Sequence, residues 1–88
     1  MANLDERAET IRIGNLAKDV LENEALQLAF NGAANDMFMK FLATNPDEDD
    51  IRTKIWATGQ SLDAIRNRLS VMVENGRMEQ DNKSYDDQ

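Results

Sequence analysis

This sequence of 88 residues contains no cysteine and no histidine. Without cysteine the chain can form no disulfide, no thiolate nucleophile and no cysteine-based zinc site. Without histidine it lacks the side chain that titrates near neutral pH and that most often binds metals. The usual nucleophile–base pairs of enzymes therefore cannot be built. These absences argue against an enzyme, and we expect no catalytic residue, no metal site and no cofactor.

The acidic run Asp47–Asp50 raises the question of a cation site. A calcium loop alternates oxygen donors, has a glycine at its sharp turn and ends in a bidentate glutamate, and the run has none of this spacing. Acidic side chains near the start of a helix interact favourably with the helix dipole. We therefore assign the run to the start of a helix.

The chain is acidic, with 17 acidic against 10 basic residues and a net charge of −7. Its basic residues are spread from Arg7 to Lys83 and form no concentrated basic face, so we expect no direct contact with nucleic acid. An acidic chain instead suits solubility, a basic protein partner or mimicry of nucleic acid. We find neither a signal-peptide pattern nor an apolar stretch as long as a membrane span, which favours a soluble intracellular chain.

Proline occurs once, glycine four times, and the alternation typical of strands is nearly missing. We therefore predict an all-α fold. It consists of a long hairpin of helices at about 24–43 and 46–75, with a shorter N-terminal helix at 4–22 packed across it. Residues 1–76 would form one domain, and residues 77–88 a flexible acidic tail.

Capping residues mark the predicted helix boundaries. Asn3 is followed three residues later by Glu6, as in a capping box, and Asn23 is a candidate second cap. Asn45 would cap the third helix, with Pro46 at its first position and Glu48 closing a box back to Asn45. Gly14 predicts a possible break in the first helix, and Gly76 the end of the third.

The predicted hairpin has two apolar faces. The face of its first helix consists of Leu26, Phe30, Ala33, Met37 and Phe41. The second helix carries a seam with a 3.5-residue repeat, which is typical of a coiled coil or a closely aligned hairpin. The seam residues are Ile51, Ile55, Thr58, Leu62, Ile65, Leu69 and Met72. Whether this seam pairs within one chain or between chains remains open.

Six residues are candidates for a protein interface: Trp56, Gly59, Phe38, Met39, Arg52 and Arg66. Trp56, the only tryptophan, either anchors a partner or covers the core of its own chain, and we favour the core. Gly59 would let a helix or ring approach the backbone. Phe38 and Met39 widen the apolar stripe and are buried either in the core or against another subunit.

Arginines on the third helix have two possible roles. Arg52 and Arg66 share one side of it with Gly59 at intervals of seven residues. They could form a basic strip, but local ion pairs with Glu48 or Asp63 are the simpler interpretation.

Two segments resemble small all-α proteins encoded among the virion-structure genes of tailed bacteriophages. These segments are VLENEALQLAF at 20–30 and IRTKIWATGQSLDAIRNRLSVMVENGRM at 51–78. The match lies in the central aromatic, the LDAIRNRL core at 62–69 and the closing Gly-Arg-Met at 76–78. The chain departs from that pattern at Glu24, where proline is common. The resemblance implies a helical hairpin that acts in host cytoplasm or in the virion, and it implies no catalytic or ligand residue.

We therefore expect a non-enzymatic virion assembly or structural protein that acts by helix–helix packing. Its partner would be a second copy of itself or another virion component. The alternative is a small acidic inhibitor that occupies a basic surface of a host protein, as an anti-defence factor would. The net charge of −7 motivates this alternative.

Overall fold

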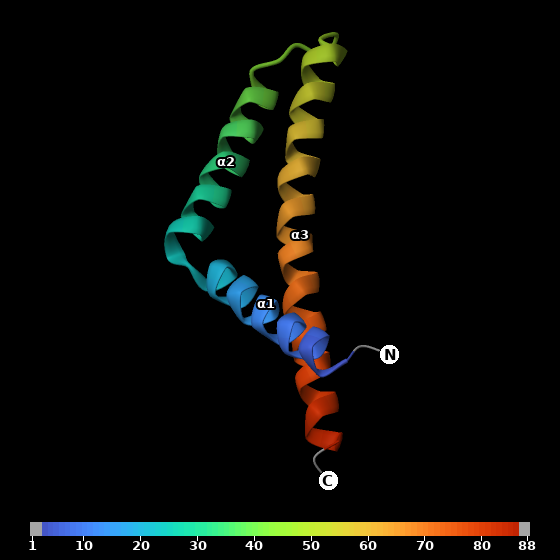
Figure 1. The fold of residues 1–88 in the computed structure, drawn as a ribbon. Helices are drawn as coiled ribbons and strands as arrows, with labels where there is room; N and C mark the ends of the chain where they lie inside the picture. Colours follow the sequence, from blue (N-terminus) through green and yellow to red (C-terminus); the bar gives the residue numbers. More distant parts are fainter. Residues whose placement is uncertain (1–2, 87–88) are drawn as a thin grey trace.

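The computed structural model describes the backbone of residues 3–86 and the side chains of residues 3–82. This part of the chain contains three α-helices and no strand: α1 (Leu4–Glu22), α2 (Glu24–Leu42) and α3 (Asp49–Asp86). The predicted all-α class is confirmed. In Figure 1 the three helices outline a triangle. Helices α2 and α3 are joined by one turn, and α1 forms the third side because it is joined to α2 and crosses α3.

Two predicted asparagine caps are confirmed. The side-chain oxygen of Asn3 accepts a hydrogen bond from the backbone N–H of Glu6 at 2.8 Å. The side-chain oxygen of Asn23 accepts from the backbone N–H of Leu26 at 2.9 Å. Each bond satisfies a donor that the first turn of a helix leaves without an internal partner.

Asn23 is also the whole connection between α1 and α2. Its backbone is extended (φ −69°, ψ 119°), and its N–H donates to the carbonyl of Val20 at 3.1 Å. From the first turn of α2, the Gln27 amide donates to the carbonyl of Leu21 at 2.9 Å. The junction at Asn23, which we call the elbow, therefore uses local side chains to satisfy backbone groups of both helices.

The third helix begins at Asp49, three residues after the predicted start at Pro46. The Glu48 carboxylate accepts from the Asn45 N–H at 2.7 Å, and the Glu48 N–H donates to the Asn45 carbonyl at 3.0 Å. These bonds close a turn at the end of the connection between α2 and α3, which spans residues 43–48. The carbonyl of Glu48 then accepts the first helical bond, from Arg52. The predicted pair of Asn45 and Glu48 thus forms, but it stabilises the turn before the helix.

The predicted break at Gly14 and helix end at Asn75 are both wrong. Helix α1 runs unbroken from Leu4 to Glu22, and α3 continues through Gly76 to Asp86. No described residue has a positive φ, so Gly76 does not adopt the left-handed conformation of a C-terminal cap. The division into a domain 1–76 and a tail 77–88 stays a prediction. Residues 77–86 are helical here, and 87–88 lie outside the described residues.

Gly14 and Gly76 are instead the point where α1 and α3 cross. A Cβ atom added to Gly14 would lie 2.9 Å from the Gly76 Cα and 2.9 Å from the Met72 carbonyl oxygen. A Cβ atom added to Gly76 would lie 3.0 Å from the Gly14 Cα. Both glycines are buried, and so is Ala17, one turn after Gly14 and only 2% exposed. The backbones can approach this closely only because neither glycine has a side chain.

The N-terminal helix therefore packs mainly against α3. Helices α2 and α3 diverge from their shared turn, as Figure 1 shows. The radius of gyration is 18.6 Å, whereas a compact chain of this length has about 12 Å. The long dimension of 62 Å is close to the length of α3, about 57 Å at 1.5 Å per residue. Within the described residues, no helix is both long and apolar enough to cross a membrane.

Candidate protein-interaction surface

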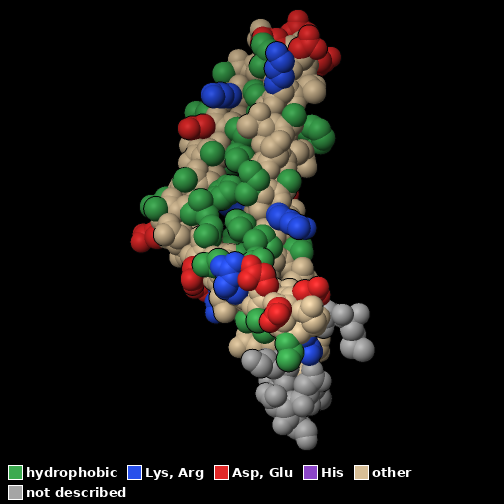
Figure 2. Space-filling view, viewed as in Figure 1, with side chains coloured by type: hydrophobic (Ala, Val, Ile, Leu, Met, Phe, Trp, Pro, Cys, Tyr) green, Lys and Arg blue, Asp and Glu red, His purple; other side chains and the backbone are tan. Residues whose placement is uncertain are grey.

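Most large apolar side chains of this molecule remain in contact with solvent. Among the described residues, Ala17 is the only hydrophobic one that is buried. Figure 2 shows hydrophobic side chains gathered along the line between α2 and α3, with charged side chains toward the edges and ends. Exposed large hydrophobics include Leu28, Phe38, Met39, Leu42, Ile51, Trp56 and Ile65. A small domain normally covers such residues, so the exposed apolar surfaces are the candidates for the functional site.

Trp56 is exposed and does not lie in the core. Its side chain is 65% exposed, so the interpretation we favoured from the sequence is wrong. A shallow groove of about 310 Å³ adjoins it and is lined by Phe41, Asp49, Arg52, Thr53 and Trp56. We call these five residues the tip groove, because they lie beside the turn that joins α2 to α3.

Arg52 gives the tip groove a fixed wall. Its guanidinium lies over the Phe41 ring, 4.7 Å from the ring centroid, and its Nε donates to the Thr44 hydroxyl at 2.8 Å. That hydroxyl donates in turn to the Phe41 carbonyl at 2.6 Å. The cation–π contact and the two hydrogen bonds hold a polar side chain against an aromatic one. The groove therefore needs little rearrangement to accept a ligand.

Phe38 extends the apolar surface beyond the tip groove. It precedes Phe41 by three residues and Leu42 by four, and these spacings make the three side chains neighbours on α2. Phe38 and Leu42 are both exposed. Met39 is also exposed, but it lies two residues from the half-buried Met37, so it faces away from α3. Phe38 thus belongs with the tip groove, whereas Met39 does not.

A second groove of about 350 Å³ lies near the corner between α1 and α2. Its walls are Leu21, Leu26, Gln27, Phe30, Asn31, Arg66 and Ser70. The Arg66 guanidinium lies 5.0 Å from the centroid of the Phe30 ring. Arg52 and Arg66 therefore have the same role in two different grooves: each guanidinium covers a phenylalanine ring of α2.

The ion pairs expected for Arg52 and Arg66 do not form within the described residues. Each guanidinium covers a phenylalanine of α2 instead of reaching Glu48 or Asp63. The sequence pattern pointed to carboxylates at helical spacing on α3 itself. The pattern could not predict the contacts of the arginines with aromatic rings, because only the tertiary fold brings Phe30 and Phe41 close to α3.

Gly59 meets α2 of its own chain. A Cβ atom added there would lie 3.8 Å from the Met37 Cε, an ordinary van der Waals distance. The tight approach that we predicted at Gly59 occurs instead between Gly14 and Gly76. The candidate residues are thus not one cluster: Arg52 and Trp56 share the tip groove, Phe38 adjoins it, and Arg66 lines the second groove.

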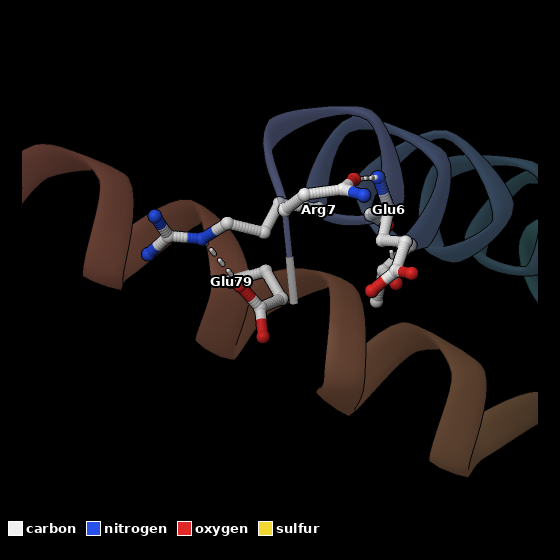
Figure 3. A network of polar contacts seen from close by, with 5 residues as sticks. Glu6, Arg7 and Glu79 are labelled. Atoms are coloured by element: carbon white, nitrogen blue, oxygen red, sulfur yellow. Dashed lines mark hydrogen bonds and ion pairs between the residues drawn. The ribbon is translucent and has the colours of Figure 1, made fainter. Parts of the chain in front are cut away.

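An ion pair ties the two crossing helices together beside the glycines. The Nε of Arg7 in α1 lies 3.0 Å from the Oε2 of Glu79 in α3, and both side chains are about three-quarters covered. Figure 3 shows the Arg7 side chain reaching from α1 to the Glu79 carboxylate. This pair fixes the position of α1 on α3 at the end of the molecule opposite to the tip groove.

Further ion pairs lie on exposed surfaces of single helices, and in two of them an arginine also donates a hydrogen bond. The Nε of Arg12 donates to Glu9 at 2.9 Å, and the Nε of Arg77 donates to Glu74 at 3.2 Å. The hydrogen bond from Arg12 lowers the pKa of Glu9, and the bond from Arg77 lowers the pKa of Glu74. The same bonds raise the pKa of both arginines. These shifts arise from local ion pairs between residues three positions apart.

The described residues include no group of acidic side chains placed to hold a metal ion. Comparisons with family models, with curated proteins and with solved structures found no match to this chain. What the molecule offers chemically is therefore an extended helical surface with exposed aromatic and aliphatic side chains.

Proposed function

We propose that this chain is a non-enzymatic assembly protein that acts by binding another protein through the tip groove. The observation that carries the proposal is the exposure of Trp56 on a rigid helical scaffold, next to Phe41 and Arg52. Tryptophan and arginine are enriched among the residues that dominate binding energy at protein interfaces. The phage virion as the setting rests on the sequence resemblance at 20–30 and 51–78.

The groove favours a particular kind of partner. Its base is aromatic, and its rim carries Asp49 in the first turn of α3, where the carboxylate is exposed. The guanidinium of Arg52 is already engaged by Phe41 and Thr44. An apolar helix face that carries one basic residue for Asp49 would complement both features. We assign this helix to another protein of the same virion.

The single tryptophan gives a direct test. Trp56 fluorescence of the purified chain should be that of a solvent-exposed indole and should be readily quenched by iodide. Adding disassembled virion proteins from the phage that encodes the chain should shift the emission to the blue and protect it from iodide. An emission that stays unchanged with every virion fraction contradicts the proposal.

Variants identify the groove as the site. Phe41→Ala should weaken partner binding by about 2 kcal/mol, because it removes an aromatic wall and the support of Arg52. Leu28→Ala is the control, because Leu28 is an apolar residue of α2 that is even more exposed than Phe41 (63% against 40%) and lies outside the groove. The control should bind like the unaltered chain.

The alternative role, an acidic inhibitor of a host protein, predicts a different pattern. Its target would be a basic host protein, and binding would depend on charge. In that case Asp47→Asn combined with Asp50→Asn would abolish binding, whereas Phe41→Ala would leave it intact. The two variants therefore separate the two functions with one binding assay.

A further inference from the structure

A second apolar surface lies on another side of α3. The heptad seam of α3 consists of two columns of side chains. Ile55, Leu62 and Leu69 form one column and are half-buried within the chain. The other column begins with Ile51, Thr58 and Ile65, and all three are exposed, the isoleucines by 46% and 53%. We call Ile51, Thr58 and Ile65 the open stripe.

The open stripe is left uncovered because α2 packs on the opposite flank of the shared column. Contacts with α2 are made by Gly59, which faces Met37, and by Arg66, which covers Phe30. Gly59 and Arg66 are seven residues apart, as are Thr58 and Ile65 on the other flank. The seam is therefore wider than one neighbouring helix can cover, and half of it remains free for a second helix.

The surface area of the chain indicates how much is left uncovered. The molecule exposes 7010 Å², whereas a compact protein of 10.0 kDa exposes about 5,200 Å². The excess is about 1,800 Å², and a stable interface covers about 800 Å² on each partner, more in obligate homodimers. The excess is thus large enough for one extensive contact between chains.

We propose that two copies of this chain pair through their open stripes, with the two α3 helices antiparallel. The stripe is suited to a two-fold axis, because Ile51 and Ile65 lie seven residues on either side of Thr58. An axis at Thr58 brings Ile51 of each copy against Ile65 of the other and sets the two threonines side by side. Apolar groups meet apolar groups, and the hydroxyls meet each other.

Charges support the same register. An axis at Thr58 places Arg68 of each copy level with residue 48 of the other, beside the exposed carboxylates of Asp47 and Asp50. Opposite charges therefore face each other twice in the dimer, although the chain as a whole carries −7. A parallel pair would instead set Arg68 against Arg68 and the acidic turn against itself.

The chain has no cysteine, so single cysteines can test the axis. Thr58→Cys should form a disulfide-linked dimer on mild oxidation, because side chains at a two-fold axis come within about 4 Å. Gln60→Cys is the matched control: residue 60 is also exposed, but it lies two positions on and so on the other side of α3. Preferential cross-linking at residue 60, or none at either position, overturns the register.

Sedimentation of the full chain tests the pairing itself. Ile65→Ser alters two contacts in each dimer and should weaken it on the order of thirtyfold, while Val71→Ser, an exposed control on another side of α3, should not. Arg68→Glu should weaken the dimer on the order of tenfold, and adding Asp47→Arg to the same chain should restore it.

A folded chain that stays monomeric at every concentration overturns this inference. It would leave the proposed function standing, because Trp56 lies two residues before Thr58 and so on the opposite side of α3. Conversely, a dimer whose tip groove binds no virion protein would retain the pairing and refute the proposed function.

Discussion

At the scale of single residues, the four glycines of this chain have distinct roles that their sequence context does not reveal. Gly14 and Gly76 permit the crossing of α1 and α3, because each would carry a Cβ atom about 3 Å from backbone atoms of the other helix. Gly59 faces the flexible end of Met37, and a Cβ atom added to Gly32 would meet nothing within 4 Å outside its own helix backbone. A mid-helix glycine looks the same in the sequence in all four cases.

We predict that Gly14→Ala and Gly76→Ala each destabilise the fold. The added methyl group would force the crossing backbones apart, and this overpacking costs more than the gain of about 1 kcal/mol in helix propensity. The expected net loss is about 1–2 kcal/mol in the free energy of unfolding, measured by urea denaturation. Unaltered stability in both variants would mean that the helices do not cross at these residues.

The remaining glycines supply the matched controls. Gly32→Ala and Gly59→Ala should each raise the free energy of unfolding by about 1 kcal/mol, because alanine favours the helix and meets no backbone. Helix propensity alone would raise the free energy of unfolding in all four variants. A decrease in one pair and an increase in the other would therefore indicate the close crossing of the backbones. A loss of stability in Gly32→Ala would contradict the open space around that residue.

Two glutamates give the chain a local response to acid. The pKa of Glu9 and of Glu74 lies below its ordinary value of 4.5, because each carboxylate accepts a hydrogen bond from an arginine three residues on. Since the folded pKa is depressed, the stabilisation is fully present above about pH 4.5 and is lost as the pH falls through the lowered pKa. NMR titration should place both midpoints below 4.5.

Replacing one arginine tests the cause of this response. Arg12→Gln should return the pKa of Glu9 toward its ordinary value and leave Glu74 unchanged, so the second pair serves as an internal control. If Glu9 titrates identically with and without Arg12, the hydrogen bond does not cause the shift.

At the scale of helices, both boundaries of α1 and of α2 were predictable from the sequence, whereas α3 begins three residues later and ends later than predicted. Asn3 and Asn23 cap α1 and α2 because their short side chains accept a bond from the residue three positions on, which is a local effect. The end of α3 was missed because Gly76 suits both a left-handed cap and a close crossing. Only the position of α1, which is distant in sequence, decides between the two.

The elbow at Asn23 offers a test at this scale. Asn23→Ala removes the bond to the Leu26 N–H and should lower the free energy of unfolding by about 1 kcal/mol. Asn67→Ala is the control, because Asn67 lies within α3 and makes only a 3.5 Å contact with Asp63. Urea denaturation should show a loss for the first variant and none for the second. An equal effect in both would exclude a special role for the cap.

The candidate surface was predictable in composition but not in orientation. The 3.5-residue repeat marked seven seam positions on α3, and three of them, Ile55, Leu62 and Leu69, are half-buried within the chain. It could not indicate that α2 would pack on the Gly59 side and leave Ile51 and Ile65 exposed, because period alone does not specify which flank a neighbour takes. Trp56 was misplaced for the same reason.

At the scale of the whole molecule, the chain has more apolar surface than it can cover alone. Helices α1 and α3 approach each other closely where they cross, whereas α2 and α3 form an open, elongated layer. Domains are normally stable only when a second layer covers the apolar face of the first. We thus propose that two surfaces of this layer bind other proteins: the open stripe a second copy, and the tip groove a virion partner.

The dependence of thermal stability on protein concentration tests this account most directly. If pairing completes the fold, the midpoint of thermal unfolding must rise as the chain concentration is raised, because mass action favours the dimer. Ile65→Ser should flatten this dependence, and Val71→Ser should preserve it. A cooperative transition whose midpoint is the same at every concentration would show that one chain is stable without a second, and would contradict the account.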